Sequence, residues 1–236
     1  MTAPRVAMAL AAGRGSRMGE AGRITPKPLM TVGCKALIDH ALDRALEAGV
    51  RMAVVNVHHL ADQVEAHLAA RVRPRIVISD ERAELLETGG ALRHARALLG
   101  EAPVFSLNTD AVFAGPPPLP PLVEAWAPQR MDALLLLVRR DQARAYTRLG
   151  DFYLGEDGVP VRRGARETAP YVYAGAQIVR PALFDDGPPG PFSANLVWDQ
   201  AAARGRLFAV VHEGPWVDVG APAGLVAADA LLREGA

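Results

Sequence analysis

Residues 9–30 read Ala-Leu-Ala-Ala-Gly-Arg-Gly-Ser-Arg-Met-Gly-Glu-Ala-Gly-Arg-Ile-Thr-Pro-Lys-Pro-Leu-Met, the most informative stretch of this chain. The apolar run 6–12 predicts a buried strand that leads into a glycine-rich loop. Gly13 and Gly15 carry no Cβ, so backbone N–H groups can approach an oxygen-rich ligand closely. Arg17 offers a planar fork for phosphate oxygens, and Lys27 offers a point charge. The segment therefore predicts a polyphosphate site.

Three kinds of phosphate-binding loop can be told apart by the spacing of their glycines. A P-loop requires Gly, four residues and then Gly-Lys-Ser/Thr, but only three residues separate Gly15 from Gly19, and Glu20 follows. The dinucleotide-binding fingerprint requires a third glycine where Met18 stands. The third pattern, Leu-x-x-Gly-x-Gly-x-Arg-Met followed by Pro-Lys-Pro-Leu, is typical of sugar-nucleotide pyrophosphorylases and fits throughout. A glycine-rich turn alone often binds nothing, but two spaced elements that match together favour a ligand.

The composition limits the class of protein. The 236 residues allow one large domain or two small ones, and the hydrophobic share of 50% supports a sizeable core. The 26 basic residues balance the 26 acidic ones, which argues against nucleic acid or an anionic membrane as a partner. Cys34 is the only cysteine, so an intramolecular disulfide cannot form. With no signal peptide and no membrane-spanning run in this sequence, we expect a soluble, cytoplasmic protein.

The first half of the chain alternates segments typical of strands and of helices. This order predicts a parallel sheet with helices on both faces. Ligands of such sheets bind beyond the carboxyl ends of the strands, so Asp110 is expected beside the glycine-rich loop. The predicted strands are 6–12, 52–57, 75–79 and 104–107, and the predicted helices are 38–46, 60–70 and 90–99.

The second half is less regular. The proline-rich stretch 114–121 predicts a stiff loop, and 148–158 predicts a hairpin with its turn at Asp157-Gly158. Gly175, inside a predicted strand, is typical of a close ligand approach. Further strands are predicted at 133–138, 171–179 and 207–211, and helices at 196–203 and 223–233. We expect one α/β domain over 1–236, with a Rossmann-like, mixed and mostly parallel sheet between helices in three layers.

Two aspartates stand in apolar surroundings, where an unpaired carboxylate is costly. Asp110 ends the sequence Leu-Asn-Thr-Asp, and Asp218 lies in Trp-Val-Asp-Val-Gly. One or two carboxylates typically hold Mg²⁺, while water and phosphate oxygens complete its coordination. Each aspartate alone fits a loop hydrogen bond or a helix cap about equally well. Together with a phosphate loop, the pair predicts a magnesium site.

Over nearly its whole length the chain resembles the sugar-1-phosphate nucleotidyltransferase family. Within that family it is most similar to short members that transfer a uridylyl group to N-acetylmuramate 1-phosphate in bacterial cell-wall recycling. The resemblance implies a nucleotide-binding half over about 1–112 and a sugar-binding half over about 113–236. The motifs that carry it are 10–18, 25–29 (Thr-Pro-Lys-Pro-Leu), 86–90 (Leu-Glu-Thr-Gly-Gly), 107–110, 150–152 (Gly-Asp-Phe) and 216–220.

The resemblance also implies roles for individual residues. Arg17 matches the arginine that grips the β- and γ-phosphates, Lys27 the lysine on the α-phosphate, and Asp110 and Asp218 the two magnesium ligands. Many relatives carry a Glu-Lys-Pro segment that binds the sugar phosphate, and Arg162-Arg163 lies roughly there instead. Implied nucleotide contacts are Leu10, Ala11, Ala12, Gly13, Gly15, Thr88, Gly89 and Asn108, and implied sugar-phosphate contacts are Gly150, Asp151, Gly175 and Asn195.

These roles predict a Mg²⁺-dependent enzyme that takes UTP and a sugar 1-phosphate and releases pyrophosphate. A mannose-1-phosphate guanylyltransferase or a glucose-1-phosphate nucleotidyltransferase would use the same loop and aspartates equally well. A regulatory subunit that binds nucleotide sugars is the alternative of another class, and the presence of Arg17, Lys27, Asp110 and Asp218 together argues against it. We expect a monomer or a small homo-oligomer.

Overall fold

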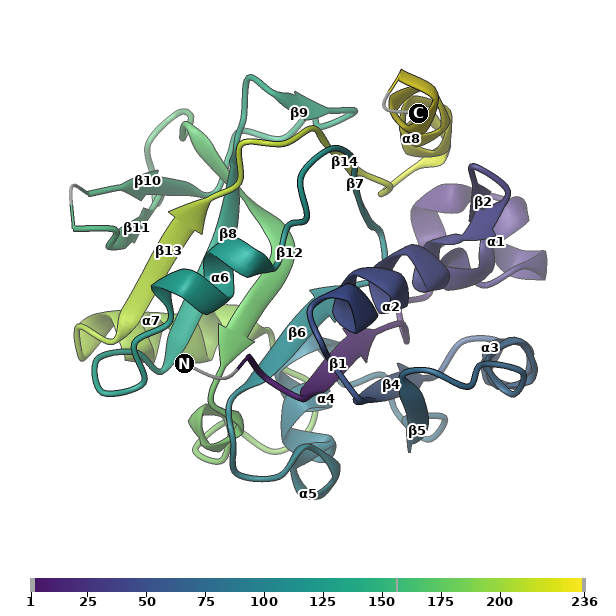
Figure 1. Cartoon of the computed structure of the whole chain (residues 1–236), viewed down its shortest axis with the longest axis horizontal. Helices are drawn as coiled ribbons and strands as arrows, with labels where there is room; N and C mark the ends of the chain where they lie inside the picture. The colour runs from purple at the N-terminus through teal and green to yellow at the C-terminus, as the bar shows by residue number, and fades with distance from the viewer. Residues whose placement is uncertain (1–2, 156, 235–236) are drawn as a thin grey trace.

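A mixed sheet of nine strands runs through the part of the chain that the computed structural model describes, residues 3–155 and 157–234 (Figure 1). Its strands are β1 (Val6–Leu10), β4 (Met52–Val57), β5 (Arg75–Asp80), β6 (Val104–Asn108), β8 (Ala133–Arg139), β10 (Phe152–Leu154), β11 (Pro160–Arg162), β12 (Tyr171–Val179) and β13 (Leu207–Val211). They follow the order β11-β10-β12-β6-β1-β4-β5, and β8 pairs with β12 and β13. The parallel arrangement of β1, β4, β5 and β6 confirms the sheet expected for the first half.

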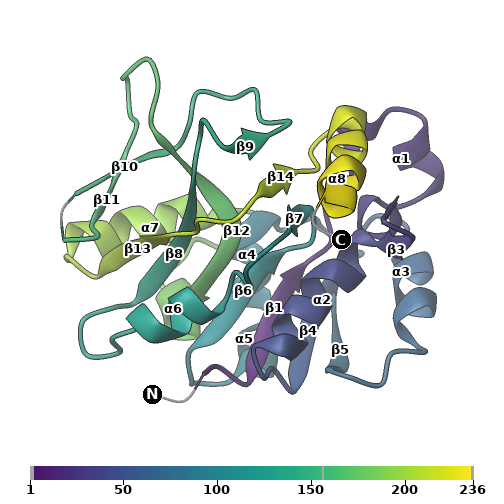
Figure 2. The same cartoon turned by 45° about the horizontal axis from the view of Figure 1, so that its top comes forward.

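Helices cover both faces of the sheet, as expected (Figures 1 and 2). One face carries α2 (Leu37–Glu47), α3 (Ala61–Leu68) and α6 (Pro120–Ala125), and the other carries α4 (Glu87–His94), α5 (Arg96–Leu99) and α7 (Ala194–Ala203). The alternation of side chains along β1 explains this layering. Met8 packs with Leu92 of α4, whereas Ala7 and Ala9 face the side of α2. The three-layer α/β/α fold is confirmed.

The second half of the chain adds antiparallel strands to this parallel core. β12 runs antiparallel to β6 and to β8, while β13 is parallel to β8. A hairpin forms from β10 and β11, which pair antiparallel, but β11 lies beyond the predicted bounds of 148–158. The turn predicted for it adjoins Glu156, which lies outside the described residues. The described strands of this sheet thus make four parallel and four antiparallel pairings.

β12 departs from regular pairing near its middle. Residues 176–179 pair with β6, whereas only the N-terminal end of β12 pairs with β10. Between these pairings, the register with β8 shifts from Tyr173 to Gln177. Gly175 lies in this shift with φ at +80°, and a Cβ there would lie 3.0 Å from the Cβ of Asn108. The glycine therefore allows a bulge that keeps β10 and β6 apart, which opens the sheet beside the end of β6.

A smaller sheet brings the C-terminal aspartate to the main one. It consists of β7 (Ala111–Phe113), β14 (Trp216–Asp218) and β9 (Ala143–Arg144). In its antiparallel register Asp218 faces Ala111, and the Val219 N–H donates to the carbonyl of Asp110 at 2.9 Å. α8 (Pro222–Glu234) then packs on the hairpin of β2 (Thr31–Val32) and β3 (Lys35–Ala36). The remaining short helices are η1 (Ser16–Met18), α1 (Ala21–Ile24), η2 (Lys27–Leu29) and η3 (Pro181–Phe184).

Several predicted boundaries need correction. The strand predicted at 6–12 ends at Leu10, because the Ala11 N–H donates to the Asn56 side chain and leaves the ladder. The helix predicted at 90–99 is two helices, since Ala95 (φ −76°, ψ 1°) separates α4 from α5. The loop predicted at 114–121 ends early, because its last prolines begin α6, where a missing N–H costs nothing. None of the described helices is long and apolar enough to span a membrane.

Burial makes His212 a source of pH-dependent stability. Its side chain is 2% exposed, packs edge-on against Phe113 with ring centroids 5.3 Å apart, and leaves Nε2 without a partner among the described residues. Burial, with a smaller contribution from the charge of Arg44, lowers the pKa of His212 from 6.5 to about 4. Between these values the unfolded chain binds a proton that the folded chain rejects, so stability is complete above pH 6.5 and falls on acidification.

The substitution His212→Leu should remove this dependence. The free energy of unfolding of the native protein should fall by about 2 kcal/mol more than that of the variant between neutral pH and the pKa of His212, after allowance for solvent screening. Urea unfolding at a series of pH values measures this, with the exposed His94→Leu as control. Equal pH dependence in the native protein and His212→Leu would contradict the assignment.

Candidate active site

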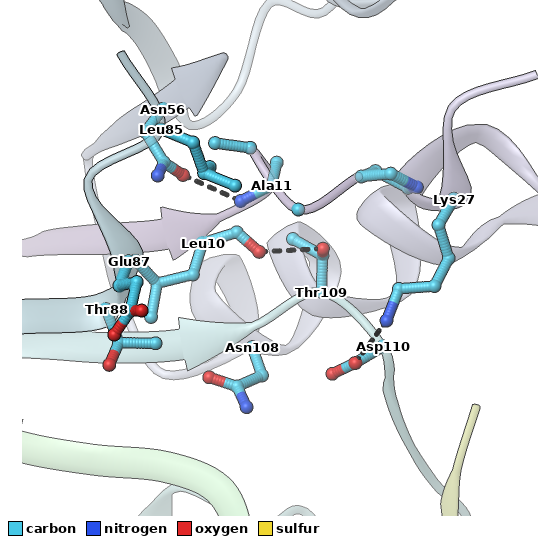
Figure 3. A pocket seen from close by; sticks show the side chains of 13 residues that line it. Leu10, Ala11, Lys27, Asn56, Leu85, Glu87, Thr88, Asn108, Thr109 and Asp110 are labelled. Carbon is cyan, nitrogen blue, oxygen red and sulfur yellow. Dashed lines mark hydrogen bonds and ion pairs between the residues drawn. The ribbon is translucent and has the colours of Figure 1, made fainter. Parts of the chain in front are cut away.

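Two adjoining cavities open beyond the carboxyl ends of β1, β4 and β6, where the topology predicts a ligand. The first encloses about 200 Å³ (Figure 3) and the second about 360 Å³. Both are lined by Leu10, Thr88, Asn108 and Asp110, which form their common wall. The first lies among β1, β4 and the start of α4, and the second lies in the opening of the sheet between β6 and β10. Two ligands bound side by side would therefore meet at Asp110.

A buried hydrogen-bond chain holds the floor of the first cavity. The Ala11 N–H donates to Asn56 Oδ1 at 2.7 Å, as Figure 3 shows, and Asn56 Nδ2 donates to Glu81 Oε1 at 2.9 Å. The second oxygen of Glu81 accepts from the Leu86 N–H at 3.3 Å, which ties the chain to the turn before α4. Burial raises the pKa of Glu81, and these hydrogen bonds oppose the rise. The chain fixes the end of β1 against the segment that carries Thr88.

The two predicted loop glycines serve different purposes. A Cβ on Gly13 would meet nothing within 4 Å, and Gly13 lines the first cavity. The lack of a side chain at Gly13 therefore leaves room for a ligand. Gly15 has φ at +61°, and a Cβ there would lie 3.2 Å from the Cβ of Lys27. Gly15 therefore lets the loop turn and pack on the Pro-Lys-Pro segment.

An ion pair joins this segment to the end of β6. Lys27 Nζ lies 2.5 Å from Asp110 Oδ2, and the side chains are only 14% and 23% exposed (Figure 3). The residues are 83 positions apart in the sequence, so the pair exists only through the sheet topology. At this burial the attraction is stronger than on an open surface. The pair places a cation and a carboxylate together at the junction of the two cavities.

Asp218 adds a second carboxylate at this junction. Burial raises the pKa of Asp218, and the nearby charge of Asp110 raises it further, while Arg148, Lys27 and Arg17 oppose the rise. Arg148 Nη2 donates to Asp218 Oδ2 at 2.8 Å. The Arg17 guanidinium lies against Gly220, where a Cβ would come within 3.1 Å of it. Two carboxylates and three cationic side chains thus converge, which suits oxygen-rich anions and a divalent cation.

The second cavity is aromatic where it extends away from this junction. Tyr173 and Trp198 meet edge-on with ring centroids 4.8 Å apart, and the Trp198 indole N–H donates to Gln177 Oε1 at 2.9 Å. Asp151 Oδ2 accepts from the backbone N–H of Tyr173 at 3.0 Å, which fixes the carboxylate at the bulge of β12. Burial raises the pKa of Tyr173, so its hydroxyl stays protonated. Aromatic faces with polar groups at their edges suit a sugar ring.

The structure brings most of the predicted site residues to the two cavities. Three predicted glycines line neither. A Cβ on Gly89 would collide with the Phe192 ring at 2.4 Å, and one on Gly150 would lie 2.1 Å from the Ala169 carbonyl, so these glycines allow close packing, as Gly15 does. The first cavity is lined by Leu10, Ala11, Ala12, Gly13, Lys27, Thr88, Asn108 and Asp110, and the second by Arg17, Asp151, Gly175, Asn195 and Asp218.

Sequence reasoning missed several lining residues. Asn56 had a local signal, since it is the one polar residue in the apolar strand 52–57. Glu87 also lines the first cavity. Its φ of +59° is unusual for a residue other than glycine and could not be predicted from the sequence. Arg148 had no local signal, because its partner Asp218 is 70 positions away. The other missed residues include Leu85 and Thr109 in the first cavity and Tyr173, Gln177 and Trp198 in the second, whereas Arg162 belongs to the Arg162-Arg163 pair already noted at the relatives' sugar-phosphate segment.

Comparisons with known proteins identify the family of this chain and proteins of similar fold. The family described as MobA-like NTP transferase domain matches residues 7–161. N-acetylmuramate alpha-1-phosphate uridylyltransferase of Caulobacter vibrioides is 48% identical over 98% of both chains, and the protein of that name from Neisseria meningitidis is 33% identical over 95% of this chain and 97% of its own. A candidate glucose-1-phosphate thymidylyltransferase from Bacillus anthracis shares the fold, with a TM-score of 0.83 at 20% identity over 97% of this chain and 95% of its own.

The open space at Gly13 leads to a prediction. Gly13→Ala should leave stability unchanged or raise it by up to about 1 kcal/mol, because the new methyl group meets no protein atom within 4 Å and restricts the unfolded chain. The same methyl group enters the first cavity, so the dissociation constant for UTP, the expected ligand, should rise ~10-fold or more. Thermal unfolding and titration calorimetry measure the two effects.

Gly15→Ala is the matched control, because its φ of +61° and its contact with Lys27 predict a loss of stability. Undiminished UTP affinity in Gly13→Ala would show that no ligand occupies the space beside this glycine.

Proposed function

This chain belongs to the MobA-like NTP transferase domain family, and on that basis we propose that it transfers a uridylyl group from UTP to N-acetylmuramate 1-phosphate. Its membership makes it a nucleotidyltransferase. The choice of UTP and of the acid sugar is supported by the two relatives that bear that name and by the match of nearly full length to both. The products are the UDP-sugar and pyrophosphate.

The observation that carries this proposal is the common wall of the two cavities at Asp110. A transfer between two phosphorylated substrates requires two pockets whose phosphate ends meet. The first cavity takes the nucleoside against Ala11, Asn56 and Thr88, and the second takes the sugar against Tyr173 and its neighbours. The α-phosphate and the sugar phosphate then lie together between Lys27 and the two aspartates.

The chemistry is a single in-line displacement. A sugar-phosphate oxygen attacks the α-phosphorus of UTP, a new P–O bond forms, and the bond to the pyrophosphate oxygen breaks. Lys27 neutralises charge on the α-phosphate, and Arg17 holds the phosphates that leave. Arg148, which reaches the junction from the sugar side, offsets the charge of the attacking phosphate. The protein acts mainly by holding two anions together and by opposing their repulsion.

The donor set at the junction fits Mg²⁺. Asp110 and Asp218 both line the second cavity, so their carboxylates would supply two hard oxygen ligands to one ion, and the charge of Asp110 raises the pKa of the buried Asp218. The described residues contain no cluster of three or more His, Cys, Asp or Glu side chains, so substrate oxygens and water would complete the coordination. When bound there, the metal neutralises the charge that develops on the phosphates. The UDP-sugar formed serves bacterial cell-wall recycling in the cytoplasm, as the resemblance implies.

Pyrophosphate release across a grid of nucleotides and sugar 1-phosphates tests the proposal. The grid combines UTP, GTP, CTP, dTTP and ATP with the 1-phosphates of N-acetylmuramate, N-acetylglucosamine, mannose and glucose, each with Mg²⁺ and with a chelator. We expect the largest kcat/KM for UTP with N-acetylmuramate 1-phosphate, and loss of activity with the chelator.

A larger kcat/KM for another pair, such as GTP with mannose 1-phosphate, would keep the mechanism and reject the substrate. An inactive protein that still binds a nucleotide in calorimetry would support the regulatory alternative instead.

A further inference from the structure

Among the described residues, Arg162 lines the second cavity without an ion pair to the junction carboxylates Asp110 and Asp218. At the junction with the first cavity, Arg17 and Arg148 accompany Asp110 and Asp218. Arg162 lines the same cavity but lies on β11, among residues of β10 and α7. Because the junction must hold the phosphate, the rest of the sugar extends toward β10 and α7. Arg162 therefore faces sugar substituents.

Its surroundings hold the Arg162 guanidinium in one orientation. Its central carbon lies 5.4 Å from the centroid of the Phe152 ring and 5.9 Å from that of Trp198. Nη2 donates to the carbonyl of Asn195 at 2.9 Å, and Nε pairs with Asp199. These contacts engage Nε and Nη2, and no other residue in the described part of the chain accepts from Nη1, which leaves that nitrogen for an acceptor in the cavity. An arginine already held in place loses little entropy when it binds an anion.

The ion pair with Asp199 does not neutralise Arg162 fully. The Asp199 side chain is 58% exposed, and water screens such a pair strongly. Arg162 itself is 32% exposed and has two aromatic rings beside it. A guanidinium with one screened partner can donate to a second carboxylate, since it has five N–H donors.

The 1-phosphates of neutral hexoses have no anionic group that could pair with Arg162, because their only anionic group is the phosphate, which lies at the junction. N-acetylmuramate differs from N-acetylglucosamine by a lactyl ether that ends in a carboxylate. We propose that Arg162 binds this carboxylate and so selects the acid sugar over its neutral parent. This inference rests on the proposed function and assigns its specificity to one residue.

The test is the ratio of kcat/KM for N-acetylmuramate 1-phosphate to that for N-acetylglucosamine 1-phosphate, both with UTP. Arg162→Met should lower kcat/KM for the acid sugar by about 10- to 100-fold, the usual effect of losing a charged hydrogen bond, and change that for the neutral sugar by less than about threefold. Arg162→Lys should recover part of the ratio, because it keeps the charge but loses the fork. Calorimetric dissociation constants give the same ratio if the neutral sugar reacts slowly.

Arg166→Met is the matched control. Arg166 also stacks on an aromatic ring, 4.5 Å from the centroid of Tyr153, but it does not line the cavity. Its removal should leave the ratio unchanged.

Equal losses with both sugars in Arg162→Met would overturn the inference, since they would assign Arg162 to the common phosphate or to packing. An unchanged ratio would overturn it as well. A native protein that does not accept N-acetylmuramate 1-phosphate would reject the proposed function and this inference together. Acceptance of the acid sugar with a ratio that Arg162→Met does not alter would reject only the inference.

Discussion

The ion pair between Lys27 and Asp110 connects the parts of this molecule that form its site. It joins the Pro-Lys-Pro segment to the end of β6, and it lies where the two cavities meet. Removal of either partner would leave a poorly solvated charge, which is more costly than the loss of a surface pair. Asp218 reaches the same place through the register of β14 with β7. The sheet topology therefore brings together the oppositely charged side chains that form the site.

The bulge at Gly175 opens the second cavity, which is lined at one end by these charged residues. Without it, β12 would extend alongside β6, and a side chain at this position would press on Asn108 and Ala111. With it, the parallel half of the sheet keeps the first cavity while the antiparallel half turns aside to form the second. One irregular residue in a regular strand thus separates two binding pockets and keeps them adjacent. Their common wall is what a transfer between two phosphates requires.

The sequence predicts those features that local patterns determine. The strands 52–57, 171–179 and 207–211 have the predicted bounds, because apolar runs between turn residues mark buried strands well. The convergence of Gly13 and Asp110 was predictable from the order of strands and helices. Arg148 was not predicted as a cavity residue, because a contact across the tertiary structure places it there. Arg162 was predicted only by its rough match to the relatives' sugar-phosphate segment, and its contact with Asn195 is likewise tertiary. Gly89 was predicted to contact the nucleotide because it lies in a matched motif. In the structure it lines neither cavity and packs against Phe192 instead.

The most direct test of this account is the turnover of Lys27→Met in pyrophosphate release from UTP and N-acetylmuramate 1-phosphate. The account predicts that kcat falls ~100-fold or more while the protein stays folded by circular dichroism, because Lys27 supplies charge at the reacting phosphate. Lys35→Met, which removes an exposed lysine paired with Asp43, should keep the native rate. A kcat for Lys27→Met within about threefold of the native value would contradict the central role given to this lysine.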